Sequence, residues 1–348
     1  MKSPILFIIF KREDTTRTVF NRIREARPPK LYIAADGPRP ERPEEKKQCL
    51  KARKVVENVD WPCEVHHLYR DENMGCGKGV SSAISWFFEH EEQGIIIEDD
   101  ILPHPDFFKY CDEMLEKYKD NEQIQMIAGC NYFYDGYQSD YSYYMSTFAC
   151  IWGWATWRRV WSTYQFDVNA YPEDEIKHKM TLHLPKDSDL YFQRVYDRMK
   201  AHIIDTWDYQ FVLNQVYYGR YSISPFTNMI ENIGMGDVNA THTTSENEVV
   251  SGHKSHSPYP LRHPNELKPD AAADEVAKVN SGQAVSEENL KKEAQEEINM
   301  LYIALQDIRK GYRVLERKNQ KHLRQVRILT IVSALLFLLS VILLVIML

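Results

Sequence analysis

The chain has 348 residues, a net charge of −7 and 12% aromatic residues. The aromatic content excludes a chain that is disordered throughout, and 14 Gly, 16 Pro and six Cys exclude collagen-like and disulfide-dense scaffolds. This length can enclose a sizeable hydrophobic core. The six cysteines show no close paired spacing, which favours reduced thiols that pack as small buried hydrophobic side chains.

Short apolar runs alternate with amphipathic stretches over about the first 130 residues. Strands are predicted at residues 5–10, 31–35, 63–69 and 95–97, and helices at about 19–26, 44–57 and 80–90. The strands start about 30 residues apart, which is the period of βαβ units. Because the strands are apolar almost throughout, a mainly parallel sheet covered on both faces is expected, which makes the fold class α/β.

The following region, from residue 129 to about 224, is rich in Tyr and Trp and loses this period. No linker-like segment precedes it, so one domain is expected over residues 1–245. Residues 246–285 lie in a stretch rich in Thr, Ser, Asn, His, Pro and Ala, and they are expected to form a flexible linker.

A helical stalk is predicted over residues 286–327. Apolar positions from Ile298 to Val326 alternate at three- and four-residue steps, with Asn319 as a polar register-setting position. The stretch from Ile308 to Arg327 holds eight Lys or Arg against Glu316 alone, a local charge of +7. This pattern favours a basic coiled coil that joins two copies as a homodimer. The alternative is an amphipathic helix lying on lipid headgroups.

The C-terminal residues 328–348 contain no charge. At ~1.5 Å per residue they just cross a hydrocarbon layer of ~30 Å, which predicts a single transmembrane helix. A buried core helix is the alternative. The basic flank predicts a membrane protein with a C-terminal anchor and a cytoplasmic catalytic domain. No signal peptide competes, because Lys11 and Arg12 follow the first apolar run without a small-residue cleavage site.

Polar residues follow each predicted strand, where open α/β sheets bind their ligands. These residues are Phe10-Lys11-Arg12, Asp36-Gly37, Asn73 to Gly79, and Glu98-Asp99-Asp100. The acidic triplet is the most informative, because three adjacent carboxylates repel one another unless a cation joins them. Hard oxygen ligands suit Mg²⁺ or Mn²⁺ bridging carboxylate and phosphate. The alternative is a solvated acidic turn.

The segment Asn73 to Gly79 contains three glycines and Lys78 just before a predicted helix. Glycine permits a close backbone approach, and a helix N-terminus attracts phosphate. The segment is not a Walker A loop, because the spacing differs and no Ser or Thr directly follows the lysine. A plain glycine-rich turn is the alternative.

Four segments, in this order, resemble the GT-A glycosyltransferases, especially the N-acetylglucosaminyltransferase I type, and also uncharacterised bacterial nucleotide-diphospho-sugar transferases. They are residues 95–108, with the acidic triplet and a Pro-Asp-Phe-Phe helix start, Ile151 to Trp157, Ile204 to Asp208, and Asn239 to His242. The resemblance covers about residues 3 to 245. It implies a GT-A fold, a Rossmann-like α/β/α sandwich, followed here by the helical stalk and the single transmembrane helix.

The resemblance also implies roles on the donor side. Asp100 would contact a divalent cation, Mn²⁺ or Mg²⁺, with Asp99 nearby, and Glu98 would face the ribose or sugar. His242 would add a metal or diphosphate contact; the alternative is simple exposure. The remaining donor-binding residues would be Phe10, Lys11, Arg12, Asp36, Asn73 and Lys78.

On the acceptor side, inversion at the anomeric centre requires a base that takes the proton of the acceptor hydroxyl. Asp208 matches that base, with Asp205 as the second choice. The alternative for Asp208 is a cap on the following helix. Trp152 and Trp154 would form an acceptor wall; core packing is the alternative for this tryptophan cluster.

The predicted function is therefore metal-dependent, inverting transfer of a hexosyl or N-acetylhexosaminyl group. The resemblance implies UDP-N-acetylglucosamine as the first donor to test and a glycan or lipid-linked acceptor, as in polysaccharide biosynthesis, with no nucleic acid partner. The alternative is a catalytically silent, tail-anchored scaffold that binds nucleotide sugars. A nucleotidyltransferase is disfavoured, because no glycine-rich signature follows the first strand.

Overall fold

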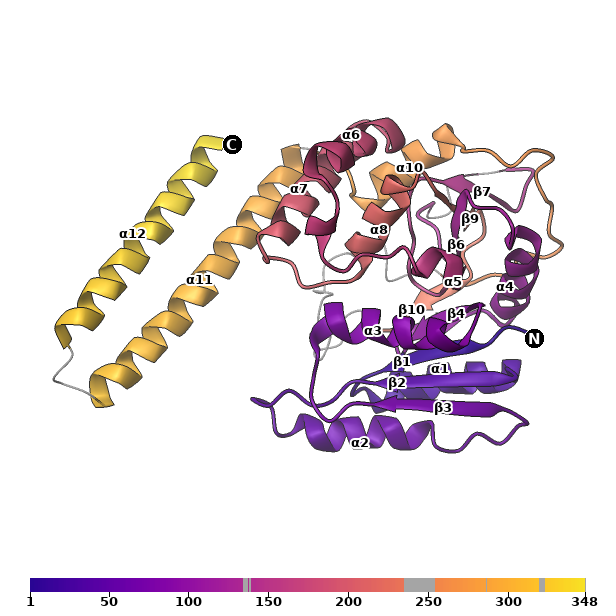
Figure 1. The fold of residues 1–348 in the computed structure, drawn as a ribbon, viewed down its shortest axis with the longest axis horizontal. Helices are drawn as coiled ribbons and strands as arrows, with labels where there is room; N and C mark the ends of the chain where they lie inside the picture. Colours follow the sequence, from indigo (N-terminus) through magenta and orange to yellow (C-terminus); the bar gives the residue numbers. More distant parts are fainter. Residues whose placement is uncertain (134–136, 138, 235–253, 286, 319–322, 348) are drawn as a thin grey trace. The chain divides into compact units, whose positions relative to one another are not determined.

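The computed structural model describes residues 1–133, 137, 139–234, 254–285, 287–318 and 323–347 (Figure 1). It divides into two compact units, Met1–Gln283 and Ala284–Leu348, which are treated separately below.

The larger unit begins with alternating strands and helices. In chain order these are β1 (Ile5–Ile9), α1 (Glu13–Ala26), β2 (Lys30–Ala35), α2 (Glu45–Val55), β3 (Glu64–Tyr69), α3 (Gly75–His90), β4 (Gln93–Glu98), β5 (Ile101–Pro103), α4 (Pro105–Tyr118) and β6 (Ile124–Ala128). Short strands and helices follow: β7 (Tyr143–Ser146), β8 (Trp154–Trp157), α5 (Arg158–Trp161), η1 (Val168–Ala170), α6 (Glu173–His183), α7 (Ser188–Lys200), α8 (Asp208–Tyr217), β9 (Tyr221–Pro225), β10 (Ile230–Asn232) and α10 (Ala271–Ser281).

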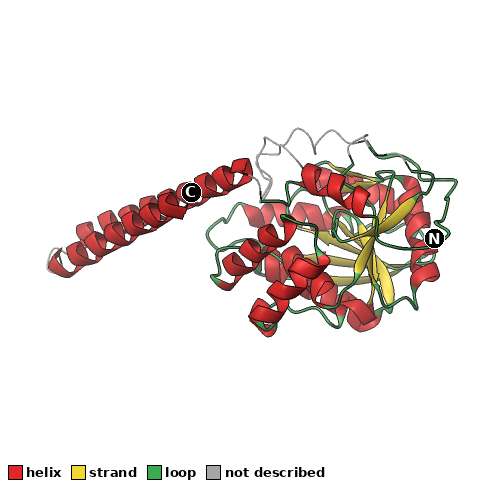
Figure 2. Ribbon diagram, turned by 90° about the horizontal axis from the view of Figure 1, so that it is seen from above, coloured by secondary structure: helices red, strands yellow, loops and turns green. Residues whose placement is uncertain are grey.

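An eight-stranded sheet with the order β3-β2-β1-β4-β8-β6-β9-β7 forms the centre of this unit. The strands β3, β2, β1 and β4 are parallel, whereas β8 is antiparallel to both of its neighbours and β7 is antiparallel to β9. Strands β5 and β10 form a separate antiparallel pair. Helices lie on both sides of the large sheet (Figure 2). The expectation of a mainly parallel sheet therefore holds for the first four strands, and the sheet as a whole is mixed.

Burial explains why the first strands read as continuous apolar runs. Residues Ile5 to Phe7 and Ile95 to Ile97 are at most 1% exposed, because neighbouring strands flank them and helices cover both faces. Helix α1 buries one face only, through Thr16, Val19, Phe20 and Ile23. This spacing brings one side of the helix onto the core and leaves the other side to solvent.

Helix α10 lies inside the segment that was expected to be a flexible linker. Its Asp270 cap accepts hydrogen bonds from the backbone N–H groups of Ala272 and Ala273. Its Asp274 is 2% exposed and accepts hydrogen bonds from Ser146 and Thr147 beside β7. These contacts make residues 271–281 part of the larger unit.

The smaller unit holds α11 (Glu287–Lys318) and α12 (Leu323–Met347), which contact one another. The register position Asn319 lies outside the described residues. The coiled-coil homodimer stays a prediction.

The predicted fold class and localisation need correction at residues 328–348. No helix among the described residues is both long and apolar enough to cross a membrane. The single transmembrane helix, and with it the membrane localisation and the cytoplasmic orientation, is therefore contradicted. The fold class is mixed α/β without that span.

Candidate active site

The carboxyl ends of β1, β2 and β4 meet at one edge of the sheet. The parallel register pairs Ile9 with Ala35 and Ile8 with Glu98, so the next residues of each strand emerge side by side. The backbone N–H of Phe10 donates to Asp99 Oδ2 over 3.1 Å. The segments that follow these three strands are therefore adjacent.

Arg12 is the cation that faces the acidic triplet. Its guanidinium donates to Asp99 and lies 3.0 Å from Asp100 Oδ2. Burial lowers the pKa of this guanidinium, but the two carboxylates raise it by more, so the group is held firmly charged. Arg12 thus lies at the edge formed by the ends of β1, β2 and β4, where it contacts carboxylates, and its role in donor binding stays a prediction.

The triplet carries more negative charge than Arg12 neutralises. Burial raises the pKa of Glu98, and Asp100, Asp99 and Asp208 raise it further. Burial also raises the pKa of Asp99, although Arg12 opposes this rise. Carboxylates that are buried close together disfavour simultaneous ionisation, so the site gains if a further cation enters.

Asp99 and Asp100 fit a divalent cation only if a bound phosphate-containing ligand supplies further oxygen atoms. No group of three or more His, Cys, Asp and Glu residues able to hold a metal ion is found among the described residues. His242 lies outside them. Mg²⁺ is commonly held by one or two carboxylates together with substrate phosphates, and the Asp100 side chain is 20% exposed at the strand end. Asp100 and Asp99 have the oxygen ligands for this kind of site.

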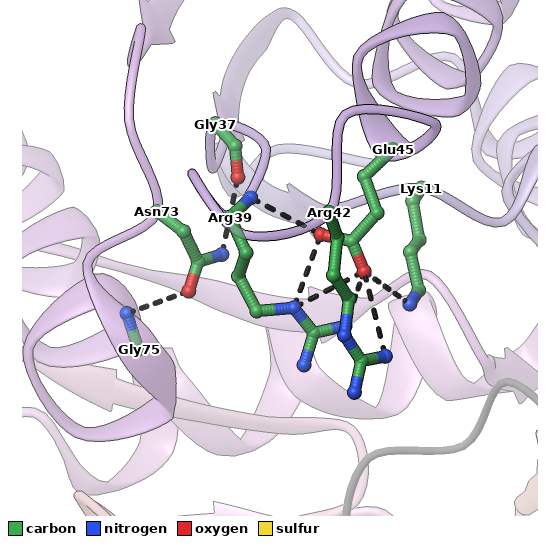
Figure 3. A network of polar contacts seen from close by, with 7 residues as sticks. All are labelled: Lys11, Gly37, Arg39, Arg42, Glu45, Asn73 and Gly75. Atoms are coloured by element: carbon green, nitrogen blue, oxygen red, sulfur yellow. Dashed lines mark hydrogen bonds and ion pairs between the residues drawn. The ribbon is translucent and has the colours of Figure 1, made fainter. Parts of the chain in front are cut away.

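A second network follows β1 through Lys11 (Figure 3). The Lys11 ammonium donates to Glu45 Oε1 over 2.8 Å, and Arg39 Nε donates to the same carboxylate over 3.0 and 3.1 Å. Burial raises the pKa of Glu45, but Arg39 and Lys11 lower it by more, to about 2. Lys11 and Arg39 also lie over the Phe10 ring, 5.4 and 5.8 Å from its centroid. The predicted donor residue Lys11 is therefore already paired with a carboxylate that sequence reasoning did not single out.

Asp36 ties the glycine-rich segment to the end of β2. Its carboxylate accepts hydrogen bonds from the backbone N–H groups of Met74 and Gly37 at 3.0 to 3.2 Å. Asn73 donates to the Gly37 carbonyl and accepts from the Gly75 N–H, each over 3.1 Å (Figure 3). Burial raises the pKa of Asp36, although these backbone donors oppose the rise. Asp36 and Asn73 shape this edge of the site, whereas Lys78 is exposed.

The glycines of this segment make room for Asp205. A Cβ at Gly77 would lie 2.5 Å from Asp205 Oδ1, and one at Gly75 would lie 2.8 Å from Oδ2. Gly75 also has a φ of +79°, which favours glycine. The sequence predicted that a phosphate would approach the N-terminus of α3. In the structure the Asp205 carboxylate lies there, which favours a positioning role for Asp205.

Asp208 begins α8 and faces a cavity. Its Oδ1 accepts hydrogen bonds from Thr206 Oγ1 and, over 2.9 Å, from the Tyr209 N–H. Oδ2 takes no hydrogen bond from the part of the chain that the structure describes. The cavity measures about 150 Å³ and is lined by Tyr132, Ala149, Cys150, Ile151, Trp152, Asp208, Tyr209, Val212 and Gln283. Two residues predicted for acceptor chemistry, Asp208 and Trp152, therefore share one cavity wall.

Trp154 lies elsewhere. It is 1% exposed, stacks on Trp207 with centroids 5.7 Å apart, and packs against Phe211 and Trp161. The alternative of core packing describes its surroundings, as it does those of Trp157 and Trp161, which are 3% and 5% exposed.

The Cys76 thiol is influenced by carboxylates of both the acidic triplet and α8. Burial raises the pKa of its thiol to about 12. Three carboxylates add to this rise: Glu98, Asp208 and Asp205. Sequence reasoning missed Cys76, Arg39 and Glu45. Only the clustered arginines and prolines of residues 38–43 stand out in the sequence near the last two.

Comparison with known proteins adds three distant structures. No family model matches the chain, and no curated protein matches it. It is similar to an apo-UDP-glucose pyrophosphorylase at 11% identity, over 67% of this chain and 94% of that one, with a TM-score of 0.36. It is also similar to a UTP-bound UGPase from Acinetobacter baumannii (10% identity, 67% and 89% covered, TM-score 0.31) and to HddC from Yersinia pseudotuberculosis (8% identity, 45% and 77% covered, TM-score 0.28). These TM-scores are too low to show a shared fold, and no GT-A glycosyltransferase is among the three, so the site is interpreted from its own geometry.

Proposed function

We propose that this protein transfers a sugar from a nucleotide diphosphate to a hydroxyl of a saccharide acceptor, with inversion at the anomeric carbon. The observation that carries the proposal is the position of Asp208, which lines the cavity with Trp152 and whose charge raises the pKa of Glu98 in the acidic triplet. A donor held at the triplet and an acceptor held in the cavity would meet at this carboxylate.

Asp208 would act as the general base. The acceptor hydroxyl gives its proton to Asp208 Oδ2, its oxygen bonds to the anomeric carbon, and the bond from that carbon to the diphosphate oxygen breaks. The two hydrogen bonds to Oδ1 hold the carboxylate in place and leave Oδ2 available for the proton. The Trp152 ring supplies an apolar face of the kind on which sugar C–H groups pack.

The donor diphosphate would be held at the edge formed by β1, β2 and β4. A Mg²⁺ or Mn²⁺ ion bound there by Asp100 and Asp99 would neutralise the diphosphate leaving group. Arg12 would orient these carboxylates, and Asp36 with Asn73 would hold the loop beside them. UDP-N-acetylglucosamine is the first donor to test.

The test measures binding and turnover separately on the full chain. Thermal shift with UDP- and GDP-sugars, with and without Mn²⁺, should identify a stabilising donor, and donor hydrolysis or transfer should then follow. Asp208→Asn should lower turnover by about 100-fold or more while the donor-induced thermal shift is retained. Asp189→Asn, a substitution on α7 outside the cavity lining, is the matched control and should leave turnover unchanged.

Three outcomes contradict the proposal. Loss of donor binding in Asp208→Asn would assign this residue a structural role. Formation of a nucleoside triphosphate from the donor and pyrophosphate would identify a nucleotidyltransferase. A thermal shift without turnover, with every donor and a mixed set of saccharide acceptors, would favour the silent scaffold.

A further inference from the structure

Two cysteines from different segments meet beside the cavity. Cys130 follows β6, and Cys150 lies four positions before the start of β8. Their Sγ atoms lie 2.7 Å apart, against about 2.05 Å in a disulfide bond, and each residue is 3% exposed. Both are free thiols in the structure. A sulfur movement of less than about 1 Å would join them.

The backbone holds the two segments together. Residues Ala128 and Trp154 pair across β6 and β8, and the Gly129 N–H donates to the Gly153 carbonyl over 2.8 Å. The Cβ of any other residue at Gly129 would lie 2.7 Å from that carbonyl, so the approach requires glycine here. The two thiols therefore meet because the chain segments that carry them are held together by backbone pairing.

Of the two cysteines, only Cys150 is among the residues that line the cavity, which measures about 150 Å³. Burial, and then the neighbouring Cys150 thiol, raises the pKa of Cys130 well above its ordinary value, which makes Cys130 a poor first nucleophile. A cavity of this size has room for a hydroperoxide.

We propose that Cys130 and Cys150 form a site of reversible oxidation, where a hydroperoxide converts the two thiols into an intramolecular disulfide. With hydrogen peroxide, the Cys150 sulfur takes one oxygen as a sulfenic acid, the O–O bond breaks and water leaves. The Cys130 sulfur then attacks the Cys150 sulfur, the S–S bond forms, and the hydroxyl leaves as a second water with the Cys130 proton. The two thiols lose two electrons to the peroxide, and a dithiol reductant returns them.

The chemical test uses the full chain treated with hydrogen peroxide, then denatured, alkylated and mapped by mass spectrometry. The expected product is a Cys130–Cys150 cross-linked peptide that dithiothreitol reverses. Cys111, which is 0% exposed and makes no contact with another thiol in the described part of the chain, is the internal control and should stay alkylatable. Alkylation of Cys130 and Cys150 at the level of Cys111 would overturn the proposal, as would cross-links to other cysteines.

Single substitutions test the order of the two steps. Cys130→Ser should stop the reaction at a Cys150 sulfenic acid, which dimedone traps. Cys150→Ser should leave Cys130 unoxidised, because the remaining sulfur does not line the cavity. A dimedone adduct on Cys130 that forms as fast in Cys150→Ser would refute the cavity route.

Access through the cavity is tested at its wall. Gln283 lines the cavity, and Gln283→Trp should slow disulfide formation several-fold. Val279→Trp is the matched control, since Val279 is 72% exposed on α10 and does not line the cavity. Equal oxidation rates in both variants would contradict this route, and mapping the cross-link still decides whether the pair oxidises.

The disulfide would also alter the cavity wall, because Tyr132 and Ala149 to Trp152 lie within two positions of the two cysteines. Oxidised protein should show a raised acceptor KM and unchanged donor binding. This last readout rests on the proposed function, whereas the cross-link does not. If the cross-link forms and the acceptor KM does not change, the oxidation site stands, but its effect on acceptor binding is refuted.

Discussion

Lys11 and Arg12 follow β1 one after the other, yet they belong to ion-pair networks of opposite net charge. Lys11 joins Arg39 and Arg42 around the single carboxylate of Glu45. Arg12 faces Asp99 and Asp100, with Glu98 beside them. The pKa of Glu45 is lowered to about 2, whereas the pKa values of Glu98 and Asp99 are raised.

This difference separates a structural network from a candidate binding site. Glu45 is 1% exposed and its charge is fully compensated, so its network stabilises the fold without a ligand. Among the described residues, Arg12 is the one cation paired with these three carboxylates, and so the triplet gains from a further cation. Substitutions in the network around Glu45 should therefore lower the free energy of unfolding. Substitutions in the acidic triplet should mainly change ligand binding.

The largest expected effect is on stability, at Glu45. Glu45→Gln leaves Lys11 buried at 9% exposure without its ion pair, and removing one partner of a buried pair costs about 3 to 5 kcal/mol. Urea unfolding should show this loss, and Glu44→Gln, on an exposed neighbour, should change stability little. A loss as small as that of the control would show that the network is not structural.

The second effect, at Asp100, is on ligand binding. Asp100→Asn removes one of the repelling carboxylates, so the free energy of unfolding should change little or rise. Turnover with Mn²⁺ should fall by about 100-fold. Substituting a residue that only hydrogen-bonds to a metal ligand typically lowers activity by about 10- to 100-fold, so the loss at Asp100 should reach or exceed the top of that range. The readouts are urea unfolding, the Mn²⁺-dependent thermal shift and donor turnover. Retention of the full thermal shift and turnover would remove Asp100 from the metal site.

A smaller effect is expected at Arg12, and a cation should reverse part of it. Arg12→Gln leaves Asp99 and Asp100 without their partner and should destabilise the protein by about 2 kcal/mol, in the range for an unpaired buried charged group. Mn²⁺ should restore part of that loss, so the Mn²⁺-induced rise in Tm should be larger in the variant than in the wild type. A smaller rise in the variant would show that Arg12 itself helps to bind the ion.

Over the pH range in which the protein stays folded, the smallest expected change is the acid dependence of the Glu45 network. The pKa of Glu45 is depressed in the folded state to about 2 from 4.5, so its contribution is fully present above pH 4.5 and is lost as the pH falls toward 2. The difference in unfolding free energy between wild type and Glu45→Gln should therefore shrink across this window. Urea unfolding of both proteins between pH 6 and the acid limit of folding measures it, and a difference that does not depend on pH would contradict the assignment.

The local features of the edge formed by β1, β2 and β4 were predictable because they depend on neighbours in the chain. Apolar runs mark the central strands, and the polar residues after each run mark the edge where parallel strands end. The register of β1, β2 and β4 then brings Arg12, Asp36 and Asp99 to one edge. The mixed half of the sheet was not predictable in this way, since β7 to β9 are short strands without a repeating pattern.

The position of a residue in the chain did not determine which contacts its side chain makes. Trp152 and Trp154 are two residues apart, yet one lines the cavity and the other is buried in the core. Lys11 and Arg12 are adjacent in the chain, yet Lys11 pairs with Glu45 and Arg12 pairs with Asp99. In both cases the side-chain environment depends on strands and helices far away in the sequence.

By itself, the sequence predicted the order of the elements from β1 to β4 and the acidic triplet at a strand end. It did so because strand burial and helix periodicity are local patterns. The tertiary structure alone decided that Glu45 takes the charge of Lys11, that Asp205 fills the space left by the glycines, that Asp208 and Trp152 share a cavity, and that Cys130 meets Cys150. These are contacts between distant segments, which depend on how the sheet is ordered and not on any residue's neighbours in the chain.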